Sequence, residues 1–244
     1  MNLSDKLFLY CERGQDPAFW AEPINALSNV AFLIAAAAAT RDYLAEPPHR
    51  RSPATAVLAA LAFVIGIGSF IFHTYATRWA SFADIVPIGV FMLSYLVFAL
   101  RRFLRMNWMA VALGIALFIL AMRYAMAIQC SNGTLLPITA HTGARCLNGT
   151  LGYAPALVAL VGTAVLLAVR THPAWRLLAV ASGVFALSMT FRTIDLEVCG
   201  LVHLAGHACG THFLWHLLNA LTLYLLLRAA IRHADDRSKD ELRG

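Results

Sequence analysis

The sequence predicts an all-α membrane protein of seven transmembrane helices, with the N-terminus outside and the C-terminus in the cytoplasm. The first observation is composition: 60% of the 244 residues are hydrophobic and 13% are charged, whereas a soluble domain carries about 25% charged residues. The mean hydropathy is +0.67. Because so few polar side chains cannot cover a water-soluble globule, we expect the bilayer to be the solvent.

The second observation is a set of apolar runs. A helix needs about 20 predominantly apolar residues to cross the hydrocarbon core. Seven runs approach that length: residues 24–39, 54–74, 82–100, 108–128, 152–169, 175–194 and 211–231. The first run is short unless Phe19 and Trp20 lie at its interface with water. We therefore predict one domain over residues 1–234, with residues 1–20 as an outer cap and residues 235–244 as a charged cytoplasmic tail.

Local signals mark the ends of several runs. Prolines within residues 46–48 and 171–173 indicate turns, because proline cannot continue a helix. Asp84 and Pro87 interrupt the third run close to its start. Thr211 is placed to be the N-cap of the seventh helix.

The third observation is the distribution of basic residues. Thirteen of the 19 Lys and Arg residues follow the first, third, fifth and seventh runs, and the positive-inside rule places those segments in the cytoplasm. The net charge of +6 then reflects flanks that attract anionic lipids, and it implies no nucleic-acid partner. The dense Ala and Arg and the short loops suggest a bacterial inner membrane, so that the outer side is the periplasm.

The cysteines agree with this orientation. All five fall on the predicted outer side, where disulfides persist. Cys130 and Cys146 bracket one loop and are candidates to pair with each other. Cys11 could pair with Cys199 or Cys209, which would tie the N-terminal segment to the loop before the seventh run. One cysteine must stay unpaired, and five free thiols are the alternative.

Five polar residues lie in or at the edges of the apolar runs: Ser69, His73, Asp84, His212 and His216. Ionisable side chains inside a membrane are costly and usually mark function. The two pairs of residues spaced four apart, 69/73 and 212/216, project from single helix faces. The predicted topology places all five towards the outer ends of their helices, so we expect them to meet at one depth.

These residue types suit one chemistry. Three neutral imidazoles bind zinc and leave a fourth position for water, whose pKa zinc lowers to about 7. A nearby carboxylate such as Asp84 can take a proton and pass it to a leaving amine, and the Ser69 hydroxyl can donate to a developing oxyanion. The alternatives are histidines that are only hydrogen-bonded in the core, Asp84 paired with Arg78 or Arg123, and Ser69 as a packing residue.

The motifs that carry these residues resemble the alkaline ceramidases. The matching segments are YCER at 10–13, FWAEPINALSN at 19–29, GSFIFH at 68–73, Asp84, FRTID at 191–195 and THFLWH at 211–216. The likeness covers nearly the whole chain in order. The His, Asp and His-x3-His spacing is shared with a wider superfamily of seven-helix hydrolases, which includes adiponectin-type receptors and GPI-lipid remodelling proteins.

The resemblance implies an intramembrane zinc amidase that hydrolyses ceramide-like lipids to a sphingoid base and a fatty acid. Carried over residue by residue, it implies zinc ligands at His73, His212 and His216, a catalytic carboxylate at Asp84, an oxyanion donor at Ser69 and a Cys11–Cys199 disulfide. The expected partners are therefore membrane lipids. The alternatives are a related zinc lipid esterase or phospholipase, and a non-enzymatic seven-helix receptor.

The resemblance also implies a calcium ion, held by acidic residues of the N-terminal segment. Glu12 and Glu22 fit the family pattern, whereas Leu9 and Gly14 stand where Asp and Asn are expected, and Asp16 could substitute after a shift of one residue. Calcium prefers six to eight oxygen ligands. The alternative is that Glu12 and Glu22 form salt bridges with Arg13 or Arg192.

Two further groups carry weaker expectations. His203 and His207 repeat the four-residue spacing in the loop before the seventh run, and we expect surface histidines there rather than a second metal site. Large apolar side chains near the polar group are candidates for an acyl-chain wall or for simple lipid contact: Phe70, Phe72, Phe91, Leu214 and Trp215.

Overall fold

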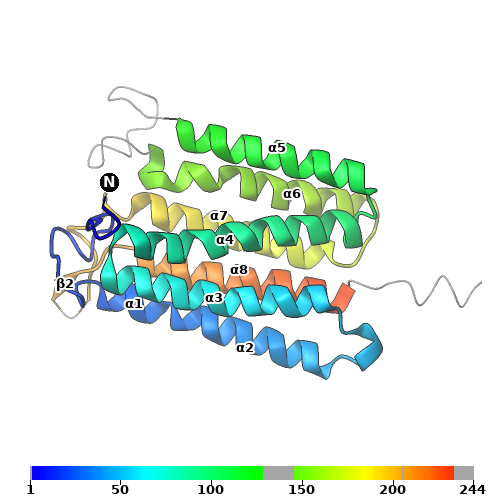
Figure 1. The fold of residues 1–244 in the computed structure, drawn as a ribbon, viewed down its shortest axis with the longest axis horizontal. Helices are drawn as coiled ribbons and strands as arrows, with labels where there is room; N and C mark the ends of the chain where they lie inside the picture. The colour runs from blue at the N-terminus through cyan, green and yellow to red at the C-terminus, as the bar shows by residue number, and fades with distance from the viewer. Residues whose placement is uncertain (1, 129–145, 205, 234–244) are drawn as a thin grey trace, which may run out of the picture.

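Long helices run side by side along the length of the molecule (Figure 1). The computed structural model describes residues 2–128, 146–204 and 206–233. The helices are α1 (Pro23–Ser28), α2 (Val30–Ala45), α3 (Pro53–Tyr75), α4 (Arg78–Phe98), α5 (Trp108–Ala127), α6 (Ala154–Val169), α7 (Trp175–Ile194) and α8 (His212–His233). Shorter elements are a 3-10 turn at Pro48–Arg50, a π-helical turn at Ala99–Phe103, a 3-10 segment at Cys146–Tyr153 and a hairpin of β1 (His203–Leu204) and β2 (His207–Ala208).

The described part of the chain contains seven spans that are long and apolar enough to cross a membrane, which confirms the predicted number. They are Pro23–Ala45, Pro53–Tyr75, Arg78–Phe103, Trp108–Ala127, Cys146–Val169, Trp175–Ile194 and His212–His233. The protein is thus all-helical and built as an integral membrane protein. Figure 1 places the N-terminal segment at one end of the bundle and the end of α8 at the other.

The first span is longer than the sequence predicts. Helix α2 continues beyond residue 39 to Ala45, because its polar residues find partners: the Thr40 hydroxyl donates to the Ala36 carbonyl at 2.8 Å, and Asp42 accepts a hydrogen bond from Tyr224 at 3.1 Å. The helix ends where Glu46 turns extended ahead of Pro47, since a residue before proline disfavours the helical conformation.

Helices α3 and α4 form a tight antiparallel pair. The turn between them uses Ala76 in the left-handed region, with φ 46°, and Thr77, whose side chain accepts from the Ala80 amide at the start of α4. The backbones touch at Gly68, where an added Cβ would lie 2.0 Å from the Ala83 carbonyl oxygen. That carbonyl is four residues before Pro87, which lies inside α4 and has no N–H to offer it.

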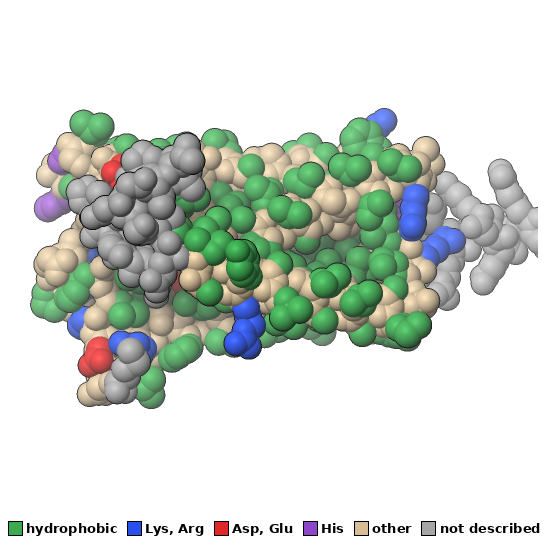
Figure 2. Space-filling view, turned by 90° about the horizontal axis from the view of Figure 1, so that it is seen from above, with side chains coloured by type: hydrophobic (Ala, Val, Ile, Leu, Met, Phe, Trp, Pro, Cys, Tyr) green, Lys and Arg blue, Asp and Glu red, His purple; other side chains and the backbone are tan. Residues whose placement is uncertain are grey.

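Apolar side chains cover the sides of the bundle. Figure 2 shows hydrophobic side chains along the length of the molecule and charged ones mainly towards its ends. In α5 only Val111, Phe118 and Ala125 are buried, which is a single stripe at seven-residue spacing, while Leu120 is 61% exposed. A soluble monomer rarely exposes so much contiguous apolar surface, so this surface fits contact with lipid.

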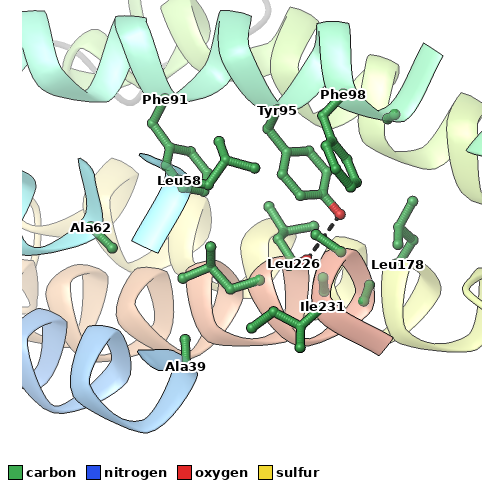
Figure 3. Close-up of a cluster of buried hydrophobic side chains, with 14 of the residues drawn as sticks. Ala39, Leu58, Ala62, Phe91, Tyr95, Phe98, Leu178, Leu226 and Ile231 are labelled. Atoms are coloured by element: carbon green, nitrogen blue, oxygen red, sulfur yellow. Dashed lines mark hydrogen bonds between the residues drawn. The ribbon is translucent and has the colours of Figure 1, made fainter. Parts of the chain in front are cut away.

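The apolar core fills the half of the bundle away from the N-terminal segment. Figure 3 shows Phe91, Tyr95 and Phe98 of α4 packed towards Leu226 of α8. The Tyr95 hydroxyl donates to the Leu226 carbonyl at 3.1 Å, which satisfies a polar group that would be costly to leave unpaired. The core therefore packs the half of the bundle away from the N-terminal segment, whereas His73, His212 and His216 lie together in the other half.

The N-terminal segment caps that other end. Its backbone pairs with the α3–α4 turn, with Leu7 N donating to Ala76 O at 2.7 Å, and a disulfide joins Cys11 to Cys199, as the resemblance implies. Cys209 is free and buried. The predicted partner of Cys146, Cys130, and the predicted tail at 235–244 lie outside the described residues.

Candidate metal centre and active site

Three histidines from two helices meet at the capped end. His73 lies in the last turn of α3, and His212 and His216 lie one turn apart at the start of α8. One ring nitrogen from each comes within 4.8 Å of the other two, and the three side chains are almost fully buried. Sequence spacing predicted this convergence, because residues four apart share a helix face.

The outward nitrogens of two of these histidines are held by neighbours. His73 Nδ1 lies 2.6 Å from Glu22 Oε2, and His216 Nδ1 lies 2.7 Å from the Ser28 hydroxyl. A carboxylate or hydroxyl on the far nitrogen fixes the ring orientation and tautomer of a metal-binding histidine. Each contact leaves the other ring nitrogen of its histidine free to face the cluster.

The cluster fits a metal better than a hydrogen-bonded core. Within the described residues, Nε2 of His73 and Nδ1 of His212 are buried and have no hydrogen-bond partner. Buried polar atoms are rarely left unpaired, and three imidazoles with one open position are the donor set of a catalytic zinc site. The cluster is also the only group of metal-ligating residues with this geometry in the described chain.

Asp84 and Ser69 lie together beside the histidines. Both are buried, and both line the same cavity as His212 and His216. The close backbone approach at Gly68 brings the helices that carry these two residues near to each other. Asp84 Oδ1 has no hydrogen-bond partner among the described residues. The salt bridge that the described residues show for Arg78 is with Asp5, at 3.9 Å, so an ion pair of Asp84 with Arg78 or Arg123 is unsupported.

A cavity of about 450 Å³ opens onto these residues. Its wall includes Ser69, Asp84, His212 and His216 together with Tyr10, whose ring stacks on His212 at a centroid distance of 3.7 Å. Burial raises the pKa of Tyr10 to about 12, although Arg192 opposes the shift. The phenol therefore keeps its proton at neutral pH and presents a neutral face to the cluster.

A second cavity of about 120 Å³ extends the first into the bundle. The two cavities adjoin, because both are lined by the same six residues: Phe32, Ile65, Ile88, Met92, Tyr153 and Trp215. The inner cavity is almost entirely apolar. Of the predicted acyl-wall residues, Phe72 lines the outer cavity, Phe91 the inner one and Trp215 both, whereas Phe70 and Leu214 line neither.

The predicted calcium ligands do not come together. Both oxygens of Glu12 accept backbone amides, from Ile24 at 2.7 Å and Asn25 at 2.8 Å, and the exposed Asp16 accepts from the Ala18 amide. No group of acidic side chains in the described ranges has metal-binding geometry. The calcium expectation for Glu12, Glu22 and Asp16 is therefore unsupported.

Glu22 is instead bound to a cation of the protein. Its Oε1 accepts from Arg13 Nε at 2.5 Å, and its Oε2 also accepts from Asn25 Nδ2 at 3.1 Å. Burial would raise the pKa of Glu22, but His73 and Arg13 hold it below its ordinary value by charge and hydrogen bonding. The salt-bridge alternative is thus confirmed for Glu22 with Arg13.

Asp195 is a structural residue of this end that the sequence did not single out. Its carboxylate accepts from the amides of Thr211 at 2.7 Å, His212 at 2.9 Å and Cys11 at 3.0 Å. It thereby caps α8 in place of the Thr211 side chain, which donates to Phe191 O instead. Gly210 permits this contact, because an added Cβ would lie 2.2 Å from Asp195 Oδ1.

Arg192 is a second residue that sequence reasoning did not assign to the site. It lines the outer cavity, and the signal was present: like Asp84, it is an ionisable residue inside an apolar run. His203 and His207, by contrast, are exposed on the β1–β2 hairpin, as expected of surface histidines.

Comparison with known proteins agrees with this geometry. The ceramidase family model matches residues 10–242, which includes residues 10–20 of the N-terminal cap, all seven membrane-capable helices and every residue of the histidine cluster. No individual curated protein matches the chain. On this match over nearly its whole length, the chain belongs to the ceramidase family.

Proposed function

We propose that the protein is an intramembrane zinc-dependent amidohydrolase, which cleaves the amide bond of ceramide-like lipids to a sphingoid base and a fatty acid. The observation that carries this proposal is the buried group of His73, His212 and His216 beside Asp84 and Ser69. The group opens onto a cavity whose wall carries several polar side chains, and this cavity adjoins an almost entirely apolar one. Membership of the ceramidase family supports the substrate class.

The three histidines would hold the zinc ion. Bound there, zinc would supply a Lewis acid that polarises the amide carbonyl and favours ionisation of water near neutral pH. Glu22 and Ser28 fix the rings of His73 and His216 from behind, so the ligands are preorganised for the ion.

Asp84 would move the proton of the reaction. Its unpartnered Oδ1 is available to accept a proton from the attacking water. The carboxyl then delivers that proton to the leaving nitrogen, so that the products are a carboxylic acid and an amine. A carboxylate in this role contributes about 10²–10⁴-fold to a rate.

Ser69 would act together with Asp84. Both side chains line the outer cavity, on two helices whose backbones approach closely at Gly68. While Asp84 carries the proton, the Ser69 hydroxyl would donate to the carbonyl oxygen as negative charge develops there. This is the role of an oxyanion donor, worth about 10²–10³-fold.

The lipid would enter between helices from the membrane, with its amide at the capped end and its acyl chain in the apolar cavity. The distribution of Lys and Arg supports an orientation in which this end faces outward, which in a bacterial inner membrane is the periplasmic side.

The proposal is tested by metal content and hydrolysis of purified protein. His212→Ala should remove stoichiometric zinc and reduce hydrolysis of a short-chain ceramide to background, while the bundle stays folded. His203→Ala changes an exposed histidine of the hairpin and should match wild type in both measurements. A His212→Ala variant with full activity contradicts the assignment. Activity on phospholipids or N-acyl amines but not on ceramide would assign the same site to the related lipid hydrolases.

A further inference from the structure

Arg192 is a partly buried cation near the end of α7 that the proposed reaction does not use. Its guanidinium lies over the rings of Tyr10, Tyr153 and Trp215, at 5.5, 5.5 and 5.1 Å from their centroids. Its Nη1 donates to the Tyr10 hydroxyl at 3.1 Å. All four side chains line the outer cavity, so one wall of that cavity is aromatic and positively charged.

The charge of Arg192 has no ion-pair partner in the described part of the chain. Asp84 and Asp195 act on it only at longer range, and its Nε is buried without a hydrogen-bond partner. The segment 129–145 contains no Asp or Glu, so it has no carboxylate to offer. A partly buried charge without an anionic partner is costly inside a membrane protein. Because Arg192 lines the outer cavity, this indicates that the cavity receives an anion.

Arg228 makes the same kind of contact with a tyrosine, but its hydrogen bonds continue to a carboxylate of the protein. Arg228 lies 5.8 Å from the ring centroid of Tyr224 and donates to its hydroxyl at 3.2 Å, and Tyr224 passes its own proton to Asp42 at 3.1 Å. In the Arg192 pair, Tyr10 donates to no acceptor among the described residues. The hydrogen bonds that start at Arg228 therefore end on the Asp42 carboxylate, whereas those that start at Arg192 end at the Tyr10 hydroxyl, which lines the cavity.

We propose that Arg192 and Tyr10 form a subsite for the carboxylate group of a long-chain acyl lipid. The guanidinium N–H groups and the phenol O–H are donors that suit the two oxygens of a carboxylate, and the adjoining apolar cavity suits its chain. This carboxylate has two chemical sources: the fatty acid that amide hydrolysis releases, or an acidic group on the amine portion of the substrate. Only the choice of source rests on the proposed function.

Equilibrium binding to the purified full-length protein tests the subsite without turnover. The probes are palmitate and hexadecanol, which share a chain and differ in the charged group. Arg192→Met keeps the length and apolar packing of the side chain, and it should weaken palmitate binding by at least about tenfold, or about 1.4 kcal/mol, with hexadecanol unchanged. Arg192→Lys should be intermediate. Arg228→Met is the matched control, because Arg228 lines neither cavity, and it should match wild type.

Hydrolysis assays with the same variants separate the two sources. If the carboxylate is that of the product, Arg192→Met relieves inhibition by palmitate and leaves the ratio of kcat/KM between an N-palmitoyl amino acid and ceramide unchanged. If it belongs to the substrate, that ratio shifts about tenfold towards ceramide. Zinc content and thermal stability of Arg192→Met establish that the site is intact. Equal loss of palmitate and hexadecanol binding, or no loss of either, would overturn the subsite.

Discussion

Two buried cation sites meet at Glu22, and they obtain their positive charge differently. On one side, the nitrogens of the three histidines face one another, and two of them have no partner in the described residues. On the other side, the guanidinium of Arg13, with its side chain 0% exposed, donates to Glu22 and to the carbonyls of Asp16 and Ala18 and of His73 and Thr74. The first site could hold an added metal ion, whereas the second contains a cation of the protein itself.

This difference explains why the histidine cluster fits the expected zinc ion while the N-terminal carboxylates do not fit the expected calcium ion. A histidine cluster with unpaired nitrogens retains its capacity to bind an ion. The oxygen pocket around Arg13 is already satisfied, because one guanidinium takes five oxygen acceptors in a fixed geometry. Arg13 also ties the N-terminal cap to the end of α3 through the His73 and Thr74 carbonyls. It therefore supports the same histidine that Glu22 orients.

Of the changes that test this comparison, replacing Arg13 by Met should cause the largest loss of stability. It leaves Glu22 buried without its cation, and breaking a buried ion pair costs about 3–5 kcal/mol. Thermal unfolding of purified protein measures the loss, and zinc content should fall as well, because Glu22 no longer holds His73 in place. Arg50→Met breaks a half-exposed pair with Glu46 and serves as the control, with an expected effect within about 1 kcal/mol. An Arg13→Met variant that keeps wild-type stability and zinc content would show that neither Glu22 nor His73 needs the Arg13 cation.

Removing the Ser28 hydroxyl should have a smaller effect, confined to the metal side. Ser28→Ala deletes the contact to His216 Nδ1 at 2.7 Å, and loss of such an outer partner lowers metal affinity by about 10–100-fold. Competition with a zinc chelator measures it. Ser81→Ala also removes a serine hydroxyl bonded to a backbone carbonyl, and it should leave zinc affinity unchanged. Equal affinities in the two variants would mean that Ser28 does not orient the ligand.

Calcium should have no effect. Because Arg13 occupies the carboxylate of Glu22 and backbone amides occupy that of Glu12, a calcium chelator should change neither the unfolding temperature nor the hydrolysis rate, provided that zinc is held constant. Titration with calcium is the converse measurement. A saturable rise in stability on adding calcium would show that the Arg13 pocket is not the only cation site of the cap.

The sequence predicted the helices well because their signal is local. Apolar runs placed α7 at 175–194 and α5 within one residue of its observed end. The misses came where polar residues continue a helix. Thr40 and Asp42 lie within α2 because a carbonyl and a distant tyrosine satisfy them, and Arg78 begins α4 ahead of the predicted start at residue 82. A hydropathy scale scores each residue by itself and does not include the hydrogen-bond partners that the fold provides.

The sequence by itself determined the seven spans, the three histidines of the cluster and their common depth, because residue type and helical spacing fix which face a side chain occupies. Only the tertiary structure decided which charges are paired. Arg13 reaches carbonyls some 60 residues away, and Asp195 caps α8 from across a loop, whereas Arg192 meets a cavity and no carboxylate. Electrostatic partners depend on distances between segments remote in sequence, and a linear pattern does not contain those distances.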